Sequence, residues 1–379
     1  MLLRLSDDQQ FFRDTTARFL LDQVPAGAVR RLRDDPAGFG RDYWSKGAEL
    51  GWTSLLVAAT HGGGTISDAG LVDLTLVADA FGRRAAPGPL IPTNVVAATL
   101  SDVDGPAWSA ELDALLSGAS VATWCFAEPA PHVRLGTITL DVRVDGADVV
   151  LHGAKRPVES ADQADDLLVT GRTGDGLTQV LVPRDAPGVS ITPLRTLDLT
   201  RRFSAVSFDD VRLPASRVVG EVARAGAQVE RQLQRAIVLG NAESVGAMQA
   251  GFDMTVEWAF DRYSFGRPLA SYQALKHRFA DMLSWLEASR AIADESAGAV
   301  AAGAPEAGEL VSAAKAYIGH HGSELLQDCV QMHGGIGVTF EHDLHLFLRR
   351  HTVDRALYGT PSEHRHRLTD LVQRREDAA

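Results

Sequence analysis

The hydrophobic periodicity of the chain changes twice along its length, and this order restricts the available folds more than any single motif does. Residues 1–118 carry apolar side chains at helical spacing. Residues 119–218 form short alternating segments separated by turn residues, a pattern typical of antiparallel strands. Residues 219–379 return to long amphipathic stretches joined by short Gly- or Pro-containing breaks. We therefore predict an N-terminal helical domain, a middle β domain and a C-terminal helical bundle with these boundaries.

The last of these regions predicts a four-helix bundle, because long helices with short connections favour antiparallel neighbours. The predicted helices cover residues 222–260, 273–302, 306–333 and 343–357. The middle region predicts an antiparallel β barrel or sandwich, since turn residues recur at short spacing between its strands. The predicted fold class is therefore a multidomain α+β protein.

Composition excludes several classes of protein. With 37 Lys and Arg against 49 Asp and Glu, the net charge is −12, which disfavours long contacts with nucleic acid. No run of 18 apolar residues predicts a membrane span. The N-terminus lacks the apolar region of a signal peptide, so we expect a cytoplasmic protein. Cys125 and Cys329 are too few for a disulfide framework or a four-thiolate metal site.

A first motif lies between the first two bundle helices. It runs from Arg262 to Leu269, and Gln273 follows at the start of the next helix. An Arg, a hydroxyl and free backbone N–H groups at such a turn suit a diphosphate. The alternative is a plain turn stabilised by Gly266 and Pro268, with Arg262 ion-paired on the surface.

A second motif, Gln331 to Gly337, ends the third bundle helix. It has glycine at 334, 335 and 337, which permits positive φ and close approach of another molecule to the backbone. An ordinary helix stop needs only one glycine. The extra glycines indicate that something large passes close to the main chain, and the alternative is a tight packing corner between helices.

Histidines are concentrated near the C-terminus, where eight of the twelve lie after residue 319. The pairs are His320/His321, His342/His345 and His364/His366. None has the i, i+4 zinc spacing with a Glu between, and the sequence shows no obvious third ligand. We therefore predict surface or interface histidines and no metal site.

Together, the two motifs and the helical–β–helical order resemble the acyl-CoA dehydrogenase family over nearly the whole chain. The first motif is similar to the family's Arg-x-x-Phe-Gly…Gln, and the second to its Gln-x-x-Gly-Gly-x-Gly. The matching residues are Arg262, Phe265, Gly266, Gln273, Gln331, Gly334, Gly335 and Gly337, followed by Arg349, Gly359 and Thr360. The resemblance implies an acyl-CoA dehydrogenase-like fold.

The resemblance also implies a noncovalent FAD shared between subunits. The implied cofactor residues, reaching a neighbour's FAD, are Arg262, Ser264, Phe265, Gln273, Gln331, Gly334 and Gly335. A dimer is then the smallest functional unit. The implied partners are an acyl-CoA thioester, an electron acceptor, and either copies of this chain (homodimer or homotetramer) or a related dehydrogenase subunit.

The family's chemistry removes two hydrogens across Cα–Cβ of the thioester, with a carboxylate as base. The two family positions for that base hold Tyr358, before Gly-Thr, and Ala236, 26 residues before the signature Arg. Glu243 and Asp354 lie on the same helices at the wrong height. The catalytic residue therefore stays unassigned.

The predicted flavin-ring site departs from the family as well. Ala127 stands where the family has a hydroxyl, and Pro157-Val158-Glu159 replaces its Trp-x-Thr. The residues that would bind the nucleotide half of a partner's FAD are present, while those that would hold the flavin ring of this chain's own FAD are replaced. We predict acyl-CoA dehydrogenation within a hetero-oligomer. The alternatives are a non-catalytic subunit that completes an FAD site or acts as a scaffold, and a flavin enzyme with different chemistry, such as hydroxylation or elimination.

Overall fold

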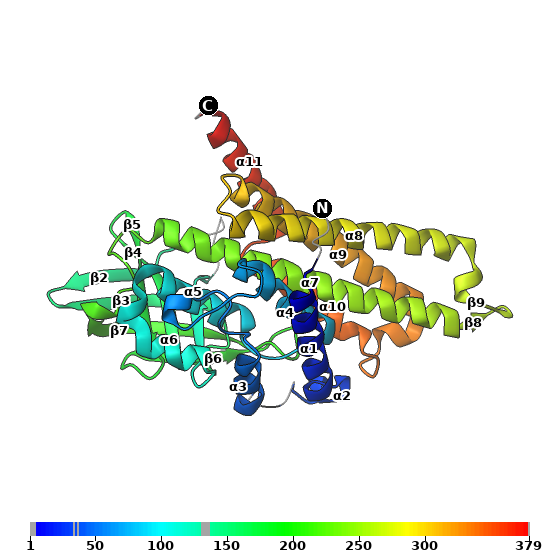
Figure 1. Cartoon of the computed structure of the whole chain (residues 1–379), viewed down its shortest axis with the longest axis horizontal. Helices are drawn as coiled ribbons and strands as arrows, with labels where there is room; N and C mark the ends of the chain where they lie inside the picture. The colour runs from blue at the N-terminus through cyan, green and yellow to red at the C-terminus, as the bar shows by residue number, and fades with distance from the viewer. Residues whose placement is uncertain (1–4, 33–34, 36–37, 130–136, 378–379) are drawn as a thin grey trace.

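The computed structural model describes residues 5–32, 35, 38–129 and 137–377 (Figure 1). The N-terminal region is helical, as its periodicity predicts. Its helices are α1 (Asp7–Gln23), α2 (Ala26–Arg31), α3 (Arg41–Glu49), α4 (Gly70–Arg84), α5 (Leu90–Asp104) and α6 (Ser109–Leu116). The fully buried Trp52 centres this region, since its ring packs edge-on against Phe19, Tyr43 and Phe81.

The middle region folds into one seven-stranded sheet. Its strands are β1 (Ala122–Cys125), β2 (Asp141–Asp145), β3 (Asp148–Glu159), β4 (Asp166–Thr173), β5 (Gly176–Pro183), β6 (Val189–Leu194) and β7 (Phe203–Pro214). Their order is β1-β4-β2-β3-β7-β6, with β5 paired to β4.

The sheet is mixed, and in this respect the antiparallel prediction was wrong. β1 pairs with β4 in parallel, and Asp141 of β2 pairs with Arg172 of β4 in parallel. The chain reverses direction twice between β1 and β4, at the β2–β3 hairpin and after β3, so the two strands run the same way. Alternating side chains carry no information on such a long-range pairing.

The C-terminal region contains the four predicted helices: α7 (Gly226–Asp261), α8 (Gln273–Ala301), α9 (Ala307–His333) and α10 (Leu344–Ala356). Figure 1 shows α7, α8 and α9 side by side, with the short hairpin of β8 (Tyr263–Ser264) and β9 (Arg267–Pro268) at one end. A fifth helix, α11 (Pro361–Asp377), packs on α9 and was not predicted. Its start carries a capping box of Thr360 and Glu363, with Pro361 as the first helical residue, a signal visible in the sequence.

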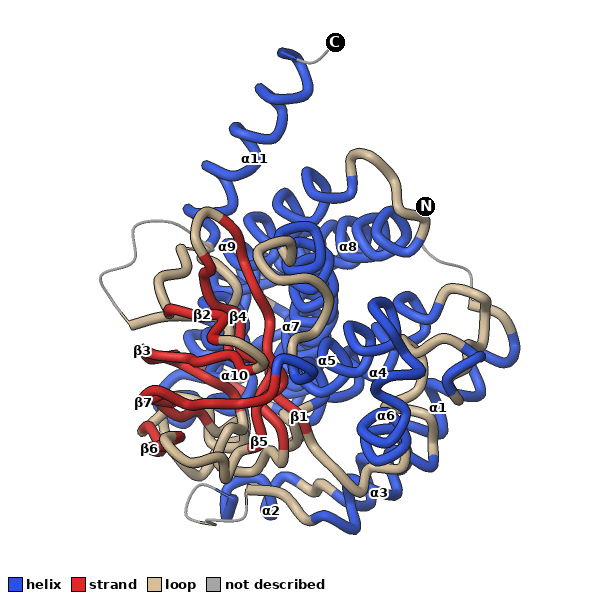
Figure 2. The backbone as a smooth tube through the Cα atoms, turned by 90° about the vertical axis from the view of Figure 1, so that its left-hand side faces the viewer, coloured by secondary structure: helices blue, strands red, loops and turns tan. Residues whose placement is uncertain are grey.

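Helix α7 holds the molecule together. Figure 2 shows the strands on one side of α7 and the N-terminal helices α1 and α4 on the other. α4 and α7 cross in backbone contact, because a Cβ at Gly82 or Gly246 would lie 1.8 Å from Glu243 O or 2.1 Å from Asp79 O. One hydrophobic core runs from the N-terminal helices through the sheet to α7, and a second fills the bundle. No helix in the described part of the chain is long and apolar enough to cross a membrane.

Candidate functional site

A cavity of about 290 Å³ lies where the sheet meets the segment after α10. Its lining includes Ala127, Pro157, Glu159 and the run from Tyr358 to Thr360. The sequence analysis placed Ala127, Pro157 and Glu159 around a flavin ring and Tyr358 at a family position for the catalytic base. The structure therefore brings the family's ring positions together, with the substituted side chains in place.

One wall of this cavity is aromatic. The ring of Trp124 stacks on Phe126, with centroids 4.5 Å apart, and on Tyr358, with centroids 5.9 Å apart. Trp124 Nε1 donates to Thr170 Oγ1 at 2.9 Å, which fixes the indole in the sheet. Burial raises the pKa of Tyr358, so its hydroxyl stays protonated at neutral pH and cannot serve as a carboxylate does.

Three carboxylates line the cavity, and the first, Glu128, is fully engaged by its own domain. It accepts hydrogen bonds from the Leu140 and Thr139 backbone N–H groups and pairs with Lys155 Nζ at 2.8 Å. Burial opposes ionisation of Glu128, but the Lys155 ammonium and these hydrogen bonds outweigh it and lower the pKa of the carboxyl. Glu128 therefore links the segment just before β2 to Lys155 of β3.

The other two carboxylates are also engaged. Arg201 binds Glu159 with two parallel hydrogen bonds, of 2.9 Å to Oε1 and 2.6 Å to Oε2. Burial raises the pKa of Glu159, and Arg201 opposes the rise. Glu363 accepts from the backbone N–H and the hydroxyl of Thr360 and so caps α11. Among the described residues that line the cavity, no carboxylate is left as a free base.

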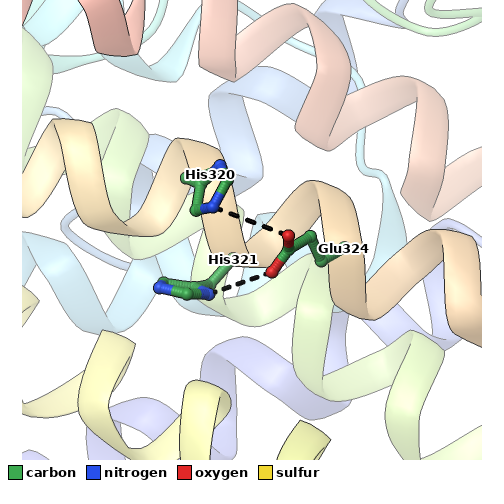
Figure 3. Close-up of side chains that lie close together, drawn as sticks. All are labelled: His320, His321 and Glu324. Carbon is green, nitrogen blue, oxygen red and sulfur yellow. Dashed lines mark hydrogen bonds and ion pairs between the residues drawn. The ribbon is translucent and has the colours of Figure 1, made fainter.

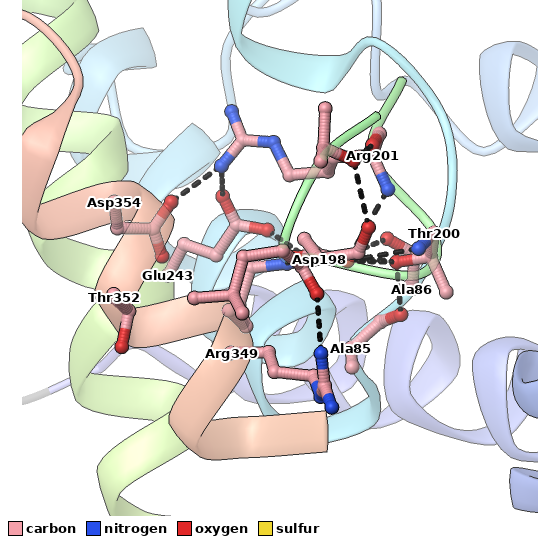
Figure 4. Close-up of polar contacts among 12 residues, drawn as sticks. Ala85, Ala86, Asp198, Thr200, Arg201, Glu243, Arg349, Thr352 and Asp354 are labelled. Carbon is pink, nitrogen blue, oxygen red and sulfur yellow. Dashed lines mark hydrogen bonds and ion pairs between the residues drawn. The ribbon is translucent and has the colours of Figure 1, made fainter. Parts of the chain in front are cut away.

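Glu159 belongs to a set of buried charged side chains that we call the buried ion network, and Figure 4 shows part of it. Its members are Glu159, Asp198, Arg201, Glu243, Arg350 and Asp354. Arg201 and Arg350 both pair with Glu243, Arg201 also pairs with Asp354, and Arg350 Nε lies 2.5 Å from Asp198 Oδ2. Removing charges from water is costly, so these groups are stable inside the protein only as partners of one another.

Besides β3, which carries Glu159, the network joins four parts of the molecule. Arg350 on α10 donates to the Ala86 carbonyl at 3.0 Å, and Thr200 Oγ1 donates to the Ala85 carbonyl at 2.9 Å. These contacts tie the α4–α5 turn to the β6–β7 loop, and Glu243 adds α7. The arginine at 350 has no exposed surface, so all of its charge is satisfied inside the protein.

The network also accounts for the two acids that sequence reasoning considered and did not accept as bases. Glu243 is held by both arginines. Burial and repulsion by Glu243 raise the pKa of Asp354 well above its usual range, and Arg201 pairs with it. Ala236 is buried in α7 and offers no polar group. The catalytic residue of this chain therefore remains unassigned.

The two sequence motifs meet at the far end of the bundle. Trp258, near the end of α7, stacks on His333, the last residue of α9, with ring centroids 5.2 Å apart. The guanidinium of Arg262 lies 5.8 Å from the centre of the Trp258 ring. In the described structure Arg262 has no ion pair, so the surface ion pair considered as an alternative is not observed.

Most of the predicted cofactor residues at this bundle end face outwards. Phe265 is 97% exposed and adopts φ 49°, an unusual conformation for a bulky residue. Ser264 is half-buried in β8, and its carbonyl accepts from the Tyr272 hydroxyl at 2.7 Å. Gln273 and Gln331 are both exposed, and Gln273 is the first residue of α8.

The three glycines of the second motif differ in what requires them. A Cβ at Gly337 would lie 2.6 Å from the Val330 carbonyl oxygen, so packing within the chain requires this glycine. Gly334 has φ 63°, a conformation that favours glycine, with open space beside it. Gly335 has neither constraint, since no atom lies within 4 Å of its built Cβ. The packing-corner alternative therefore explains Gly337 but not Gly335.

Large apolar side chains are exposed around these loops. Of the twelve exposed large hydrophobic residues in the described chain, half lie here, and we call them the bundle-end patch. The patch consists of Phe260, Tyr263, Phe265, Ile336, Val338 and Phe340. Grouped exposed apolar residues of this kind mark an interaction surface more often than isolated ones do.

The histidine pairs have different surroundings. His320 and His321 both contact the carboxylate of Glu324, at 3.5 and 3.2 Å (Figure 3). The sequence analysis missed this third residue, although spacings of four and three residues along one helix place it beside both imidazoles. His345 and His364 are instead bonded to the backbone carbonyls of Phe340 and Tyr358.

Comparisons with known proteins agree with this architecture. Family models described as the N-terminal and C-terminal domains of acyl-CoA dehydrogenase match residues 6–103 and 224–371. Acyl-CoA dehydrogenase IpdE2 of Mycobacterium tuberculosis is 29% identical over 371 residues, covering 97% of this chain and 98% of the relative.

Solved structures match over the whole fold. Butyryl-CoA dehydrogenase from Megasphaera elsdenii superposes with a TM-score of 0.89 at 21% identity, covering 98% of this chain and 100% of that one. A variant of the Tcur3481-Tcur3483 steroid ACAD gives a TM-score of 0.88 at 24% identity, covering 98% of this chain and 99% of that one. At these identities the structural matches establish the fold, and the family models establish the lineage. The chain belongs to the acyl-CoA dehydrogenase family of FAD-dependent oxidoreductases.

Proposed function

We propose that this chain works in a cytoplasmic hetero-oligomer that converts an acyl-CoA thioester to its α,β-unsaturated product. In this assembly the bundle end of the chain completes the FAD site of a related dehydrogenase subunit. That subunit supplies the catalytic base, and a separate acceptor takes up the electrons. FAD supplies the redox chemistry when bound, and the protein supplies binding and alignment.

The bundle end has the groups that a nucleotide diphosphate needs. Arg262 offers a guanidinium with no ion pair in the described structure, and a guanidinium can bind a diphosphate with two parallel hydrogen bonds. α8 begins at Gln273, so its first backbone N–H groups are free for an anion. Gly334 and Gly335 leave open space beside the main chain, where an extended ligand can lie.

The exposed apolar residues support a second subunit at the same place. Phe265 and Gly266 both hold positive φ as the two central residues of the tight β8–β9 turn, and this turn leaves the Phe265 ring almost fully exposed. A subunit that covers the bundle-end patch removes this apolar area from water and encloses the nucleotide at the same time.

The cavity supports a division of labour between subunits. Each of its three carboxylates is bonded within the chain, and the two family positions for the base are Tyr358 and Ala236. The observation that carries the proposal is this contrast between a satisfied cavity and an open bundle end.

The test is to purify the chain alone and together with candidate partner dehydrogenases. We expect the single chain to show no acyl-CoA oxidation with an artificial electron acceptor. We expect the mixed complex to be active and to hold fewer FAD molecules than chains. Full activity of the purified single chain would overturn the proposal.

The missing base also supports a second candidate, a flavin enzyme of the same fold with different chemistry, such as hydroxylation or elimination. No proton abstraction by a carboxylate is then required. Assays under air and under nitrogen detect hydroxylation, because it consumes oxygen, whereas an elimination is detected by its products under either gas. A complex that binds FAD but never turns over any substrate would instead indicate a scaffold subunit.

A further inference from the structure

Two imidazoles and one carboxylate converge on the surface of α9 (Figure 3). They belong to His320, His321 and Glu324. One ligand atom from each of the three lies within 4.8 Å of the others. The side chains are 49%, 23% and 42% exposed, so a small ion can reach them from solvent.

Two of the distances within this group are close to those between the ligand atoms of one metal ion. His320 Nε2 lies 3.5 Å from Glu324 Oε1, and His321 Nδ1 lies 3.2 Å from Glu324 Oε2. A tetrahedral zinc ion with bonds of about 2.0–2.2 Å places its ligand atoms roughly 3.3–3.5 Å apart. The two nitrogen–oxygen pairs therefore need little movement to bind one ion between them.

Neighbouring rings hold His321 in the required orientation. The Trp285 ring stacks on it with centroids 5.5 Å apart, and the Tyr317 ring lies 4.3 Å away. The His320 ring meets it edge-on at 4.8 Å. Packing of this kind limits the rotamers of a ligand before the ion arrives and so lowers the entropy cost of binding.

We propose that His320, His321 and Glu324 form a binding site for a divalent transition-metal ion of the zinc class. Two imidazole nitrogens favour zinc, nickel or copper over magnesium or calcium, which prefer oxygen ligands. Three protein ligands leave at least one coordination position for water. This site is independent of the proposed FAD role.

A second group in the described chain provides an internal comparison. His152, Asp209 and Asp210 also converge, but they offer only one nitrogen, and all three residues are exposed. The His152 Nδ1 atom lies 3.9 Å from one aspartate and 3.5 Å from the other. With one nitrogen and wider spacing, this group is expected to bind transition metals more weakly.

The experiment is calorimetric titration of zinc chloride into the tag-free full chain. We expect one saturable site per chain and no heat of binding with magnesium chloride. His320→Ala and Glu324→Gln should each weaken binding at least about tenfold, since even outer-shell partners of a metal are worth about 10–100-fold. His152→Ala should leave the affinity unchanged, and because all these positions are on the surface, every variant should keep the parent melting temperature.

Trp285 gives an independent readout. Copper or nickel bound beside His321 should quench its fluorescence, and the quenching should saturate at the calorimetric stoichiometry. Trp285→Phe should lose that quenching while still binding zinc. The absence of saturable binding up to millimolar zinc would overturn the proposal. Unchanged affinity in His320→Ala and Glu324→Gln would overturn it too, as would loss of binding in His152→Ala.

Discussion

Two regions of the molecule differ in whether their side chains have partners within the chain. One is the cavity with its buried ion network, and the other is the outer end of the helical bundle. In the network each charged side chain has a charged partner in the same chain. At the bundle end Arg262 has no ion pair in the described structure, and Phe265 is almost fully exposed. The first region is complete in a single chain, while the second has binding groups that the single chain does not use.

This difference separates stability from function. A carboxylate that already neutralises two buried arginines, as Glu243 does, cannot also exchange protons with a substrate without leaving a buried charge unpaired. The exposed Phe265 ring buries almost no apolar area in the isolated chain and so adds little to its stability. Changes in the network should therefore alter folding, and changes at the bundle end should alter assembly and cofactor binding.

The largest effect is expected from Arg350→Met. It leaves Asp198 and Glu243 buried without this partner, and breaking a buried ion pair on one side costs about 3–5 kcal/mol. Urea unfolding of the single chain measures the loss. Arg143→Met, which breaks solvent-exposed ion pairs with Asp141 and Asp210, is the matched control and should cost only about 0–1 kcal/mol. Equal losses in the two variants would contradict the assignment of the network to stability.

The next effect is expected from Arg262→Ala in the mixed complex. Loss of a charge-assisted hydrogen bond of about 1.5–3 kcal/mol corresponds to roughly 10–150-fold weaker FAD binding. Arg267→Ala is the matched control, because Arg267 lies in the same hairpin with its guanidinium 3.9 Å from the Tyr272 ring centre. Titration of the apo complex with FAD measures both variants. Weaker binding in Arg267→Ala alone would place the diphosphate elsewhere.

A buried histidine, His351, should also make the stability of the folded chain depend on pH. Burial, with repulsion by Lys315 and Arg355, lowers the pKa of His351 from 6.5 to about 3. As the pH falls, the His351 imidazole is therefore protonated in the unfolded chain before it is protonated in the folded chain. The stability that the buried neutral imidazole contributes is complete above pH 6.5 and is lost as the pH falls towards 3. Between pH 6.5 and 5 the loss is about 2 kcal/mol.

Urea unfolding at pH 7 and pH 5 tests this dependence. The difference in unfolding free energy should shrink in His351→Gln, which has no imidazole, and should persist in His366→Gln, an exposed control. The Ser244 and Ser323 hydroxyls contact the two ring nitrogens at 2.6 and 3.1 Å, so the ring is fixed in the folded chain. An unchanged difference in His351→Gln would contradict the buried neutral imidazole.

The smallest effect, and the sharpest contrast, is expected from two neighbouring glycines. Gly337→Ala places a methyl group against the Val330 carbonyl and should destabilise the single chain by at least about 1 kcal/mol. Gly335→Ala enters open space and should leave the stability of the single chain nearly unchanged. In the mixed complex, Gly335→Ala should weaken FAD binding more than Gly337→Ala does. Equal effects on FAD binding would mean that no ligand passes close to Gly335.

The sequence predicted what depends on local periodicity and could not predict what depends on distant pairing. Helical and strand periods predicted the order of the three regions and the four bundle helices, and both are confirmed. The parallel pairing of β1 with β4 was missed because register between distant strands leaves no local signal. α11 was missed although Thr360, Pro361 and Glu363 carried a start signal.

Some parts of the candidate site were likewise visible in the sequence, and others depended on contacts between distant residues. Glycine and arginine motifs were visible in the sequence, but their meeting at one bundle end depends on the contact between Trp258 and His333. The buried ion network was not predicted, since Arg201, Glu243 and Arg350 lie on three separate elements. The cofactor role of the seven predicted residues, from Arg262 to Gly335, stays a prediction.

The most direct measurement is the ratio of FAD to chains, from flavin absorbance and protein concentration, in the purified single chain and in a purified complex with a related dehydrogenase. The account predicts almost no FAD and no acyl-CoA oxidation in the single chain, and about one FAD for each pair of different chains in an active complex. A single chain that retains one FAD per polypeptide and oxidises acyl-CoA unaided would contradict it.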